Sequence, residues 1–242
     1  MVNKFVAAVS MSILALALIS VPASSAKQSS GTCGSIPKTT ALKIAVMGDS
    51  IATPYRPAPD SNTPDSLAWM NLLKTQGATH DWSVTLHGVG STTASQYLPG
   101  ESMYPVTESV KTLQPNIVLM DWRANEQLNG QTPEQLKTNL LALMDEIRTG
   151  SPNTNFMMVN PPKLWYHVFN QGPHTQEDYM AKMYEAAQER NGCWVDMVSA
   201  FPQTGPDAYS RVFMPDDIHP SNAGHAIYFA AVYNALLQAC SA

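Results

Sequence analysis

The sequence predicts an α/β fold, a three-layer α/β/α sandwich around a mainly parallel five-stranded sheet. Short apolar segments typical of buried strands alternate along the chain with longer segments of helical periodicity. Glycine or polar residues follow most of these strands, as expected where parallel strands end in turns. The crossovers should be right-handed, and ligand-binding residues should gather at the carboxyl ends of the strands.

Five strands account for the sheet. Four are apolar runs rich in residues that favour strands, and the segment Trp82–Leu86 alternates between apolar and polar residues. The predicted strands are Ile44–Met47, Trp82–Leu86, Ile117–Met120, Phe156–Val159 and Trp194–Val198.

The helices between these strands are marked by caps and by apolar periodicity. Thr63-Pro64 has the form of an N-cap followed by proline at the first helical position. Thr132-Pro-Glu-Gln135 is a capping box, and Thr175 is a further N-cap. The expected helices span about residues 63–77, 106–113, 132–150, 175–190 and 221–240.

The beginning of the chain has the features of a secretory signal. Residues 1–26 combine the positive charge of Lys4, an apolar core over 5–21 and small residues at Ala23–Ala26 for cleavage. The core is short for a transmembrane anchor. We expect a signal peptide over residues 1–26, a polar linker over 27–40 and one domain over 41–242. The mature protein should be secreted, or at least extracytoplasmic, without stable insertion in a membrane.

The charge and the cysteine content limit the expected partners and disulfides. Removing Lys4 with the signal lowers the formal net charge from −5 to −6, and no basic block remains, so nucleic acid is not expected as a partner. Three cysteines leave one unpaired if a disulfide forms. Strand starts and the ends of return helices share one edge of the sheet, which favours Cys33–Cys240; Cys193–Cys240 stays open.

Four short motifs fall at the predicted carboxyl ends of strands or just before the last helix: Gly48-Asp-Ser50, Gly90-Ser91, Ala124-Asn-Glu126 and Asp216-Asp-Ile-His219. In this order they resemble the four blocks of the SGNH hydrolases, also called the GDSL esterase/lipase family. That family has a Gly-Asp-Ser turn, a block-two glycine, a Gly-x-Asn-Asp block and an Asp-x-x-His pair. The resemblance covers the chain from about residue 43 and implies a flavodoxin-like SGNH hydrolase fold.

The resemblance implies a catalytic site. Ser50 would be the nucleophile, His219 its base, and Asp216 the group that orients His219. The backbone N–H groups of Ser50 and Gly90 and the side chain of Asn125 would form the oxyanion hole. A serine hydroxyl needs such a base, and the tetrahedral intermediate needs fixed donors for its oxyanion. No metal and no organic cofactor is implied.

Some positions have more than one interpretation. Ala124 and Glu126 depart from the usual glycine before and aspartate after the asparagine. Gly88 competes with Gly90, and His225 competes with His219, although its place inside the last helix favours a packing or capping role.

Four further residues are candidates for the walls of the substrate site. Trp122 and Arg123 directly precede the oxyanion motif, and Trp165 and Tyr166 belong to an aromatic loop after the fourth strand. Stacking on sugars or covering an acyl chain would both use such residues.

The sequence therefore predicts a secreted serine esterase that cleaves carboxylic esters, with short acyl groups on a glycan or lipid as the expected substrates. Three alternatives remain: an acyltransferase with the same triad, a non-catalytic binding module on the hydrolase scaffold, and a flavodoxin-like phosphate- or nucleotide-binding protein. The last is disfavoured because no glycine-rich cradle opens directly into a helix after the first strand.

Overall fold

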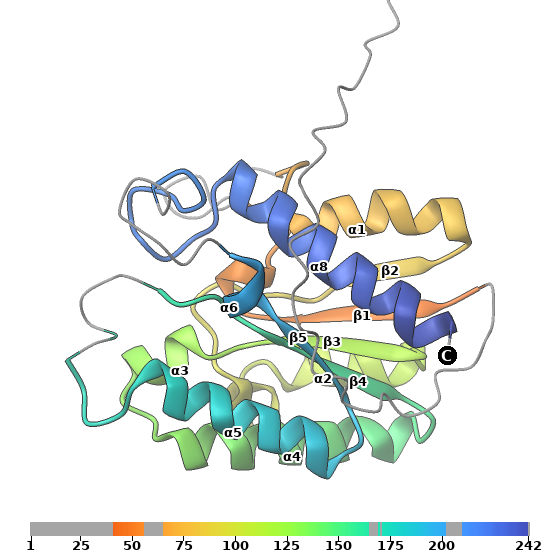
Figure 1. Cartoon of the computed structure of the whole chain (residues 1–242). Helices are drawn as coiled ribbons and strands as arrows, with labels where there is room; N and C mark the ends of the chain where they lie inside the picture. The colour runs from red at the N-terminus through yellow and green to blue at the C-terminus, as the bar shows by residue number, and fades with distance from the viewer. Residues whose placement is uncertain (1–40, 56–64, 165–168, 170, 202–209, 242) are drawn as a thin grey trace, which may run out of the picture.

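The computed structural model describes residues 41–55, 65–164, 169, 171–201 and 210–241. Its centre is a five-stranded sheet of order β2-β1-β3-β4-β5, in which every neighbouring pair is parallel (Figure 1). The predicted fold class is therefore confirmed. The strands are β1 (Lys43–Gly48), β2 (Ser83–Leu86), β3 (Ile117–Asp121), β4 (Asn155–Asn160) and β5 (Cys193–Asp196).

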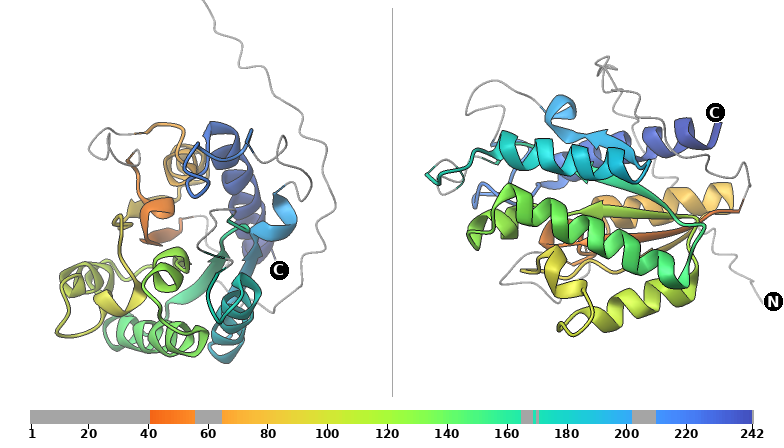
Figure 2. Two further views of the ribbon diagram at one scale, coloured as in Figure 1. Left: turned by 90° about the vertical axis from the view of Figure 1, so that its left-hand side faces the viewer. Right: turned by 90° about the horizontal axis from the view of Figure 1, so that it is seen from below.

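Helices cover both faces of this sheet, as the views in Figures 1 and 2 show. On one face lie α1 (Trp69–Gly77) and α8 (Asn222–Ser241). On the other lie α2 (Tyr104–Leu113), α4 (Pro133–Gly150) and α5 (Gln176–Glu189). The shorter helices are η1 (Ser50–Ala52), η2 (Ala78–His80), η3 (Ala94–Tyr97), α3 (Ala124–Leu128) and α6 (Met197–Ala200).

The strands divide their side chains between two cores. In β1, Ile44 and Val46 pack in the cluster that holds α1 and α8, whereas Ala45 and Met47 pack in the cluster beneath α2, α4 and α5. Successive side chains of a strand point to opposite faces of the sheet. Both faces are covered here, which explains why β1 reads as an uninterrupted apolar run.

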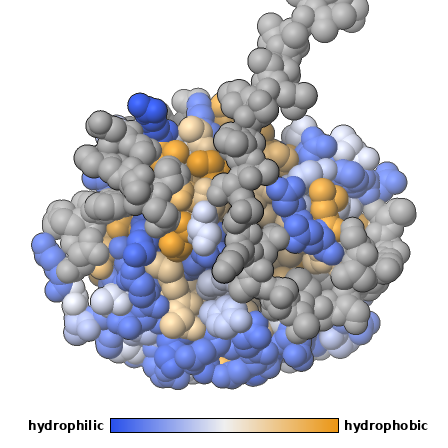
Figure 3. Space-filling model, in the orientation of Figure 1, coloured by the Kyte–Doolittle hydropathy of each residue, from blue (hydrophilic) through white to orange (hydrophobic). Residues whose placement is uncertain are grey.

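The outer surface of α4 and α5 is hydrophilic, seen as the blue lower rim in Figure 3. Ion pairs join the two helices there, including Lys137–Glu185 at 2.8 Å and Arg190–Asp145 at 2.7 Å. The polar residues on these helices are thus the outward faces of amphipathic elements whose apolar faces cover the sheet.

The predicted caps of α4 and α5 are confirmed. In α4, the Gln135 N–H donates to the Thr132 hydroxyl at 3.2 Å, and the Thr132 N–H donates to the Gln135 side chain at 2.7 Å. Thr175 forms the same reciprocal pair with Asp178 at the start of α5.

The predicted start of the first helix at Thr63-Pro64 is wrong. Residues 56–64 lie outside the described part of the chain, and α1 begins only at Trp69. Before it, the Asp65 side chain accepts the Leu67 N–H at 2.9 Å, and the Asp65 carbonyl accepts the Ala68 N–H at 3.1 Å. These local bonds form a turn in place of the first helical residues.

The fifth strand is shorter than predicted. It ends at Asp196, because the carboxylate of that residue accepts the Val198 N–H at 2.9 Å and caps the short helix α6. Residues that the sequence assigned to the end of a strand therefore begin a helix.

The predicted signal peptide and linker fall in residues 1–40, outside the described residues, as do Cys33 and the side chain of Cys240. Cys193 is buried at the start of β5 and takes part in a disulfide. Because Cys193 has a partner, the preferred pair Cys33–Cys240 finds no support, and Cys193–Cys240 stays a prediction. None of the helices in the described residues combines the length and apolar character needed to cross a membrane.

The order of the strands fixes where a site can form. The chain runs from β1 to β2 at one side and then crosses to β3 at the other side of β1. The strand order therefore reverses between β1 and β3, and ligands bind at the carboxyl ends of strands beside such a reversal. Gly48 and Asp121 are paired in register at this edge.

One glycine at this edge supplies a stability test. A Cβ atom at Gly88 would lie 2.0 Å from the Ala52 carbonyl oxygen, so Gly88→Ala forces the loop after β2 away from η1. We expect the free energy of unfolding, measured by urea denaturation, to fall by about 2 kcal/mol or more. Gly172→Ala is the control, because its Cβ meets nothing closer than 4.0 Å. Equal stability of the two variants would contradict this packing.

Candidate active site

Ser50 is held at the tip of the first strand by the two residues before it. Gly48 has a φ of +157°, and a Cβ there would lie 2.3 Å from the Asp121 carbonyl oxygen, so this position requires glycine. The Asp49 carboxylate then accepts the Ile51 N–H at 2.9 Å and caps η1. Ser50 is the first residue of η1 and is partly exposed.

His219 and Asp216 meet Ser50 from the loop that precedes α8. The distance from the His219 Nε2 atom to the Ser50 Oγ atom is 2.8 Å, and the distance from His219 Nδ1 to Asp216 Oδ2 is 2.7 Å. The structure thus brings together the three residues that the sequence placed in one site. The three side chains form a continuous hydrogen-bonded chain.

The surroundings of Asp216 favour its ionised form. Burial acts to raise the pKa of this carboxyl, but the N–H groups of His219 and Ile218 and the His219 ring outweigh it, so the pKa lies below its usual range. The two N–H groups donate to Asp216 Oδ1 at 2.9 and 3.0 Å, which leaves Oδ2 for the imidazole. A single short loop therefore both orients and ionises the partner of His219.

The loop after β2 brings Gly90 to Ser50. It continues the pairing with β1, since the N–H groups of His87 and Val89 donate to the carbonyls of Val46 and Gly48 at 2.8 and 3.0 Å. A Cβ at Gly90 would lie 3.8 Å from the Ser50 Cβ atom. Gly90 lies beside the serine, whereas the competing Gly88 packs on the backbone of Ala52.

Asn125 lies between these two turns. Its side-chain amide donates to the Thr92 carbonyl at 3.0 Å and makes a long contact of 3.4 Å with Asp49 Oδ2. The amide is therefore bonded to the residue before Ser50 and to the second residue after Gly90. All three candidate oxyanion donors belong to one small region of the molecule.

Buried ionisable groups that were not predicted from the sequence lie beneath this region. Burial raises the pKa of Asp49 to about 6, although the Ile51 N–H, His219 and Arg123 oppose the shift. Burial and the charge of Asp49 hold the pKa of Asp121 well above its usual range. Burial raises the pKa of Glu126 to about 8. The sequence signal that could have indicated these buried groups is the polar residues at the ends of the apolar β1 and β3 segments.

Two of the predicted substrate-binding residues are not at the mouth of the site. Trp122 is fully buried and packs edge-on against Tyr97, with ring centroids 5.1 Å apart. Arg123 is also fully buried, and its guanidinium donates to the Gln176 side chain at 2.8 Å and to the Pro162 carbonyl at 2.6 Å. Both predictions are corrected: these side chains support the fold. The other two, Trp165 and Tyr166, lie outside the described residues.

The backbone conformation of Arg123 changes how residues 123–126 align with the Gly-x-Asn-Asp block of the family. In a Gly-x-Asn-Asp block that ends on Asn125 and Glu126, the glycine falls on Arg123 and not on Ala124. Arg123 has a φ of +150°, a conformation that favours glycine. The hydrogen bonds of its buried guanidinium hold a non-glycine residue in this conformation.

His225 has the capping role that the sequence favoured. Its Nδ1 atom accepts the N–H of Trp69, the first residue of α1, at 3.3 Å. Ala68, the N-cap residue, makes no side-chain cap bond of its own. Burial lowers the pKa of His225 to about 4, with Asp65 opposing and His219 adding to the shift. This imidazole is therefore a neutral structural acceptor.

Comparisons with known proteins give the family of the chain. The chain belongs to the GDSL-like Lipase/Acylhydrolase family, whose model matches residues 46–227. It is accordingly a carboxylic ester hydrolase. No curated protein matches the chain by sequence.

Several solved structures share the fold at low identity. The acetylxylan esterase Axe2 from Geobacillus stearothermophilus is 20% identical with a TM-score of 0.61, over 86% of this chain and 96% of that one. The esterase EstA from Pseudoalteromonas sp., in a structure inhibited by monoethylphosphonate, is 16% identical with a TM-score of 0.64, over 81% and 97%. TesA is 19% identical with a TM-score of 0.60, over 81% and 99%.

The buried His225 predicts a pH effect on stability. The pKa of His225 is about 4 in the folded chain and near 6.5 in the unfolded chain. Between these pH values the unfolded chain binds a proton that the folded chain does not bind. The free energy of unfolding is therefore highest above about pH 6.5 and falls as the pH drops towards 4. In His225→Gln an amide oxygen can accept the Trp69 N–H without this loss. Between pH 6.5 and 4 the wild type should lose on the order of 3 kcal/mol relative to the variant in urea denaturation.

Esterase activity is the control for this comparison. His225→Gln should keep the activity of the wild type at neutral pH, because His219 and not His225 contacts Ser50. Parallel stability curves, or an inactive but folded variant, would contradict the assignment.

Proposed function

We propose that the protein is a secreted serine esterase that acts through an acyl-enzyme. Ser50 is the nucleophile, His219 the general base and Asp216 the group that orients His219. The observation that carries this proposal is the pair of short hydrogen bonds from Ser50 to His219 and from His219 to Asp216. A base in hydrogen-bond contact with a hydroxyl, itself oriented by a carboxylate, is what activates a serine.

Each residue has a defined part in the two half-reactions. The Ser50 Oγ atom attacks the ester carbonyl carbon while His219 Nε2 takes its proton. His219 then returns that proton to the departing alcohol, and the acyl group stays on Ser50. A water molecule next loses a proton to His219 and attacks the acyl-enzyme, which releases the carboxylic acid. Asp216 keeps the proton of the neutral ring on Nδ1 and stabilises the imidazolium.

The oxyanion is assigned to the N–H groups of Ser50 and Gly90 and to the Asn125 amide. The distance from the Asn125 side-chain nitrogen to Asp49 Oδ2 is 3.4 Å, at the outer limit of a hydrogen bond. The amide hydrogen that points to Asp49 is therefore available to a nearby oxyanion. The stronger bond to the Thr92 carbonyl at 3.0 Å keeps the amide in place meanwhile. A donor of this kind contributes about 3 kcal/mol to the stability of the transition state.

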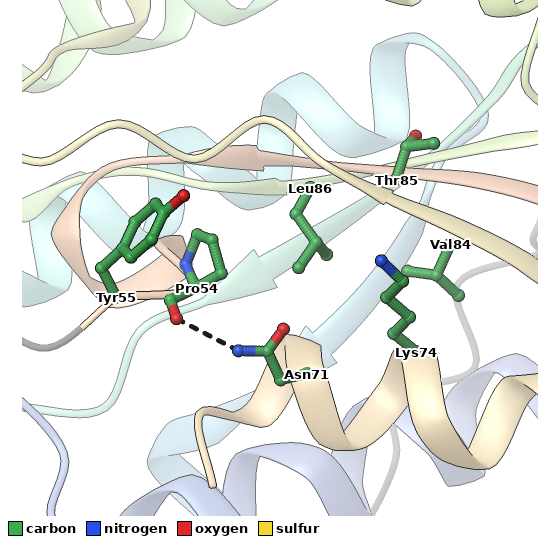
Figure 4. A pocket seen from close by; sticks show the side chains of 7 residues that line it. All are labelled: Pro54, Tyr55, Asn71, Lys74, Val84, Thr85 and Leu86. Carbon is green, nitrogen blue, oxygen red and sulfur yellow. Dashed lines mark hydrogen bonds between the residues drawn. The ribbon is translucent and has the colours of Figure 1, made fainter. Parts of the chain in front are cut away.

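A glycan that carries short acyl groups is the substrate we favour over a lipid. An open groove of about 490 Å³ begins at Pro54 and Tyr55, shortly after η1, and runs between α1 and the edge strand β2 (Figure 4). Tyr55 is 45% exposed in this groove, and Lys74 and Asn71 add polar atoms to it. An exposed aromatic ring with polar neighbours suits a sugar better than an acyl chain. The similarity to an acetylxylan esterase supports the same choice.

Secretion and the reaction type complete the proposal. Residues 1–26 are proposed to direct export. Acyl transfer to a sugar or lipid hydroxyl would use the same three residues and is the second candidate. A binding module without activity is disfavoured, since Ser50, His219 and Asp216 are joined by hydrogen bonds.

Replacement of the nucleophile tests the central assignment. Ser50→Ala should lower kcat/KM for p-nitrophenyl acetate by about 10⁴-fold or more, because the variant lacks the hydroxyl that is hydrogen-bonded to His219. Circular dichroism should show an unchanged fold. Ser66→Ala, at an exposed turn, is the matched control and should keep full activity. A folded Ser50→Ala enzyme with activity within tenfold of the wild type would refute the proposal.

The groove is tested with two substrates of different size. Tyr55→Ala and Lys74→Ala should each raise KM for acetylated xylo-oligosaccharides by about fivefold, which corresponds to a loss of roughly 1 kcal/mol. Hydrolysis of p-nitrophenyl acetate should not change. Tyr184→Ala, an exposed tyrosine on α5, is the control. Unchanged KM values in both groove variants would remove the groove from the substrate site.

A further inference from the structure

The side chain of Glu126 is fully buried beside the proposed oxyanion hole. Its Oε1 atom accepts the N–H of Ala94, the first residue of η3, at 2.8 Å. Its Oε2 atom is also buried and has no hydrogen-bond partner among the described residues. Neither the triad nor the oxyanion hole as assigned above uses this carboxyl group.

Glu126 and its neighbour Asn125 bind the same loop. Asn125 donates to the Thr92 carbonyl at 3.0 Å, and Glu126 accepts from Ala94 at 2.8 Å. The Thr92 hydroxyl in turn donates to the Val89 carbonyl at 2.7 Å, next to Gly90. Asn125 and Glu126, two successive residues of α3, are therefore hydrogen-bonded to the loop that contains the proposed backbone donor Gly90.

We propose that Glu126 is a positioning residue that sets Asn125 and Gly90 at the distance the oxyanion requires, and that it acts only as the neutral carboxylic acid. This inference rests on the proposed function of Ser50, Gly90 and Asn125. Glu126 does not touch the reacting atoms. It acts through the Ala94 N–H and the loop attached to it.

The surroundings of Glu126 oppose its ionisation. Burial raises its pKa to about 8, the charge of Asp49 adds to the shift, and the backbone N–H groups of Ala94, Glu126 and Arg123 oppose it. The other titratable groups that interact with it are Asp121 on β3, Tyr97 on η3 and Tyr179 on α5. All of them are acids.

The cation nearest to Glu126 in the sequence is engaged elsewhere. Arg123, the N-cap residue of α3, donates to Gln176 and to the Pro162 carbonyl. An ionised Glu126 would thus put an uncompensated negative charge beside donors that must stabilise a second negative charge.

This arrangement predicts a specific change in the pH profile. In the wild type, kcat for p-nitrophenyl acetate should fall as the pH rises through about 8. Glu126→Gln keeps an oxygen that accepts the Ala94 N–H but cannot ionise, so its kcat should stay level over the same range. Glu126→Ala lacks the acceptor, and its kcat should be about 10- to 100-fold lower at every pH, with KM nearly unchanged.

Controls separate positioning from general damage to the fold. Glu101→Gln, at an exposed position, should reproduce the wild-type profile. If Glu126→Ala does not fold, Glu126→Gln alone decides the question. A wild-type pH profile in folded Glu126→Gln, or a folded Glu126→Ala with kcat within twofold of the wild type, would overturn the inference. Failure of the proposed function would look different: a folded wild type without esterase activity, or an active Ser50→Ala variant.

Discussion

The hydrogen bond between Ser50 Oγ and His219 Nε2 joins two residues 169 positions apart. It can form only because β1 lies inside the sheet, where its end meets the loop before α8. That loop is placed by α8, whose Tyr228 ring stacks on Trp69 of α1 at 5.8 Å. Gly224 adds a further constraint, since a Cβ there would lie 2.1 Å from the Val212 carbonyl oxygen. The contact at the site therefore depends on correct packing of the whole α1–α8 layer.

Beneath that contact the protein buries Asp49, Asp121, Glu126 and Arg123. Both oxygens of Asp121 and one nitrogen of Arg123 lack hydrogen-bond partners within the described part of the chain. Groups of this kind cost stability, roughly 1–3 kcal/mol for each unsatisfied polar atom. An apolar core would be more stable, but it would supply neither the cap of η1 by Asp49 nor the bond of Glu126 to the loop of Gly90. These two hydrogen bonds account for the presence of Asp49 and Glu126.

Much of the fold could be predicted from the sequence, because the signals that matter are local. An apolar run marks β1, and the boxes at Thr132 and Thr175 mark the starts of α4 and α5. Residues Ser50 and His219 could be placed together because their motifs resemble two blocks of the SGNH hydrolases. The start of α1 could not be predicted, since its cap, His225, is 156 residues away. The burial of Arg123 was missed for the same reason: its partners, Gln176 and Pro162, come from other elements.

The most direct test of the account is the site of covalent reaction with a fluorophosphonate ester, mapped by mass spectrometry of peptides. The wild-type protein should carry one adduct, on Ser50, because the hydroxyl of this residue is hydrogen-bonded to His219. The folded His219→Ala variant should react far more slowly. An adduct on another residue, or rapid labelling of Ser50 without His219, would contradict the claim that this contact activates the serine.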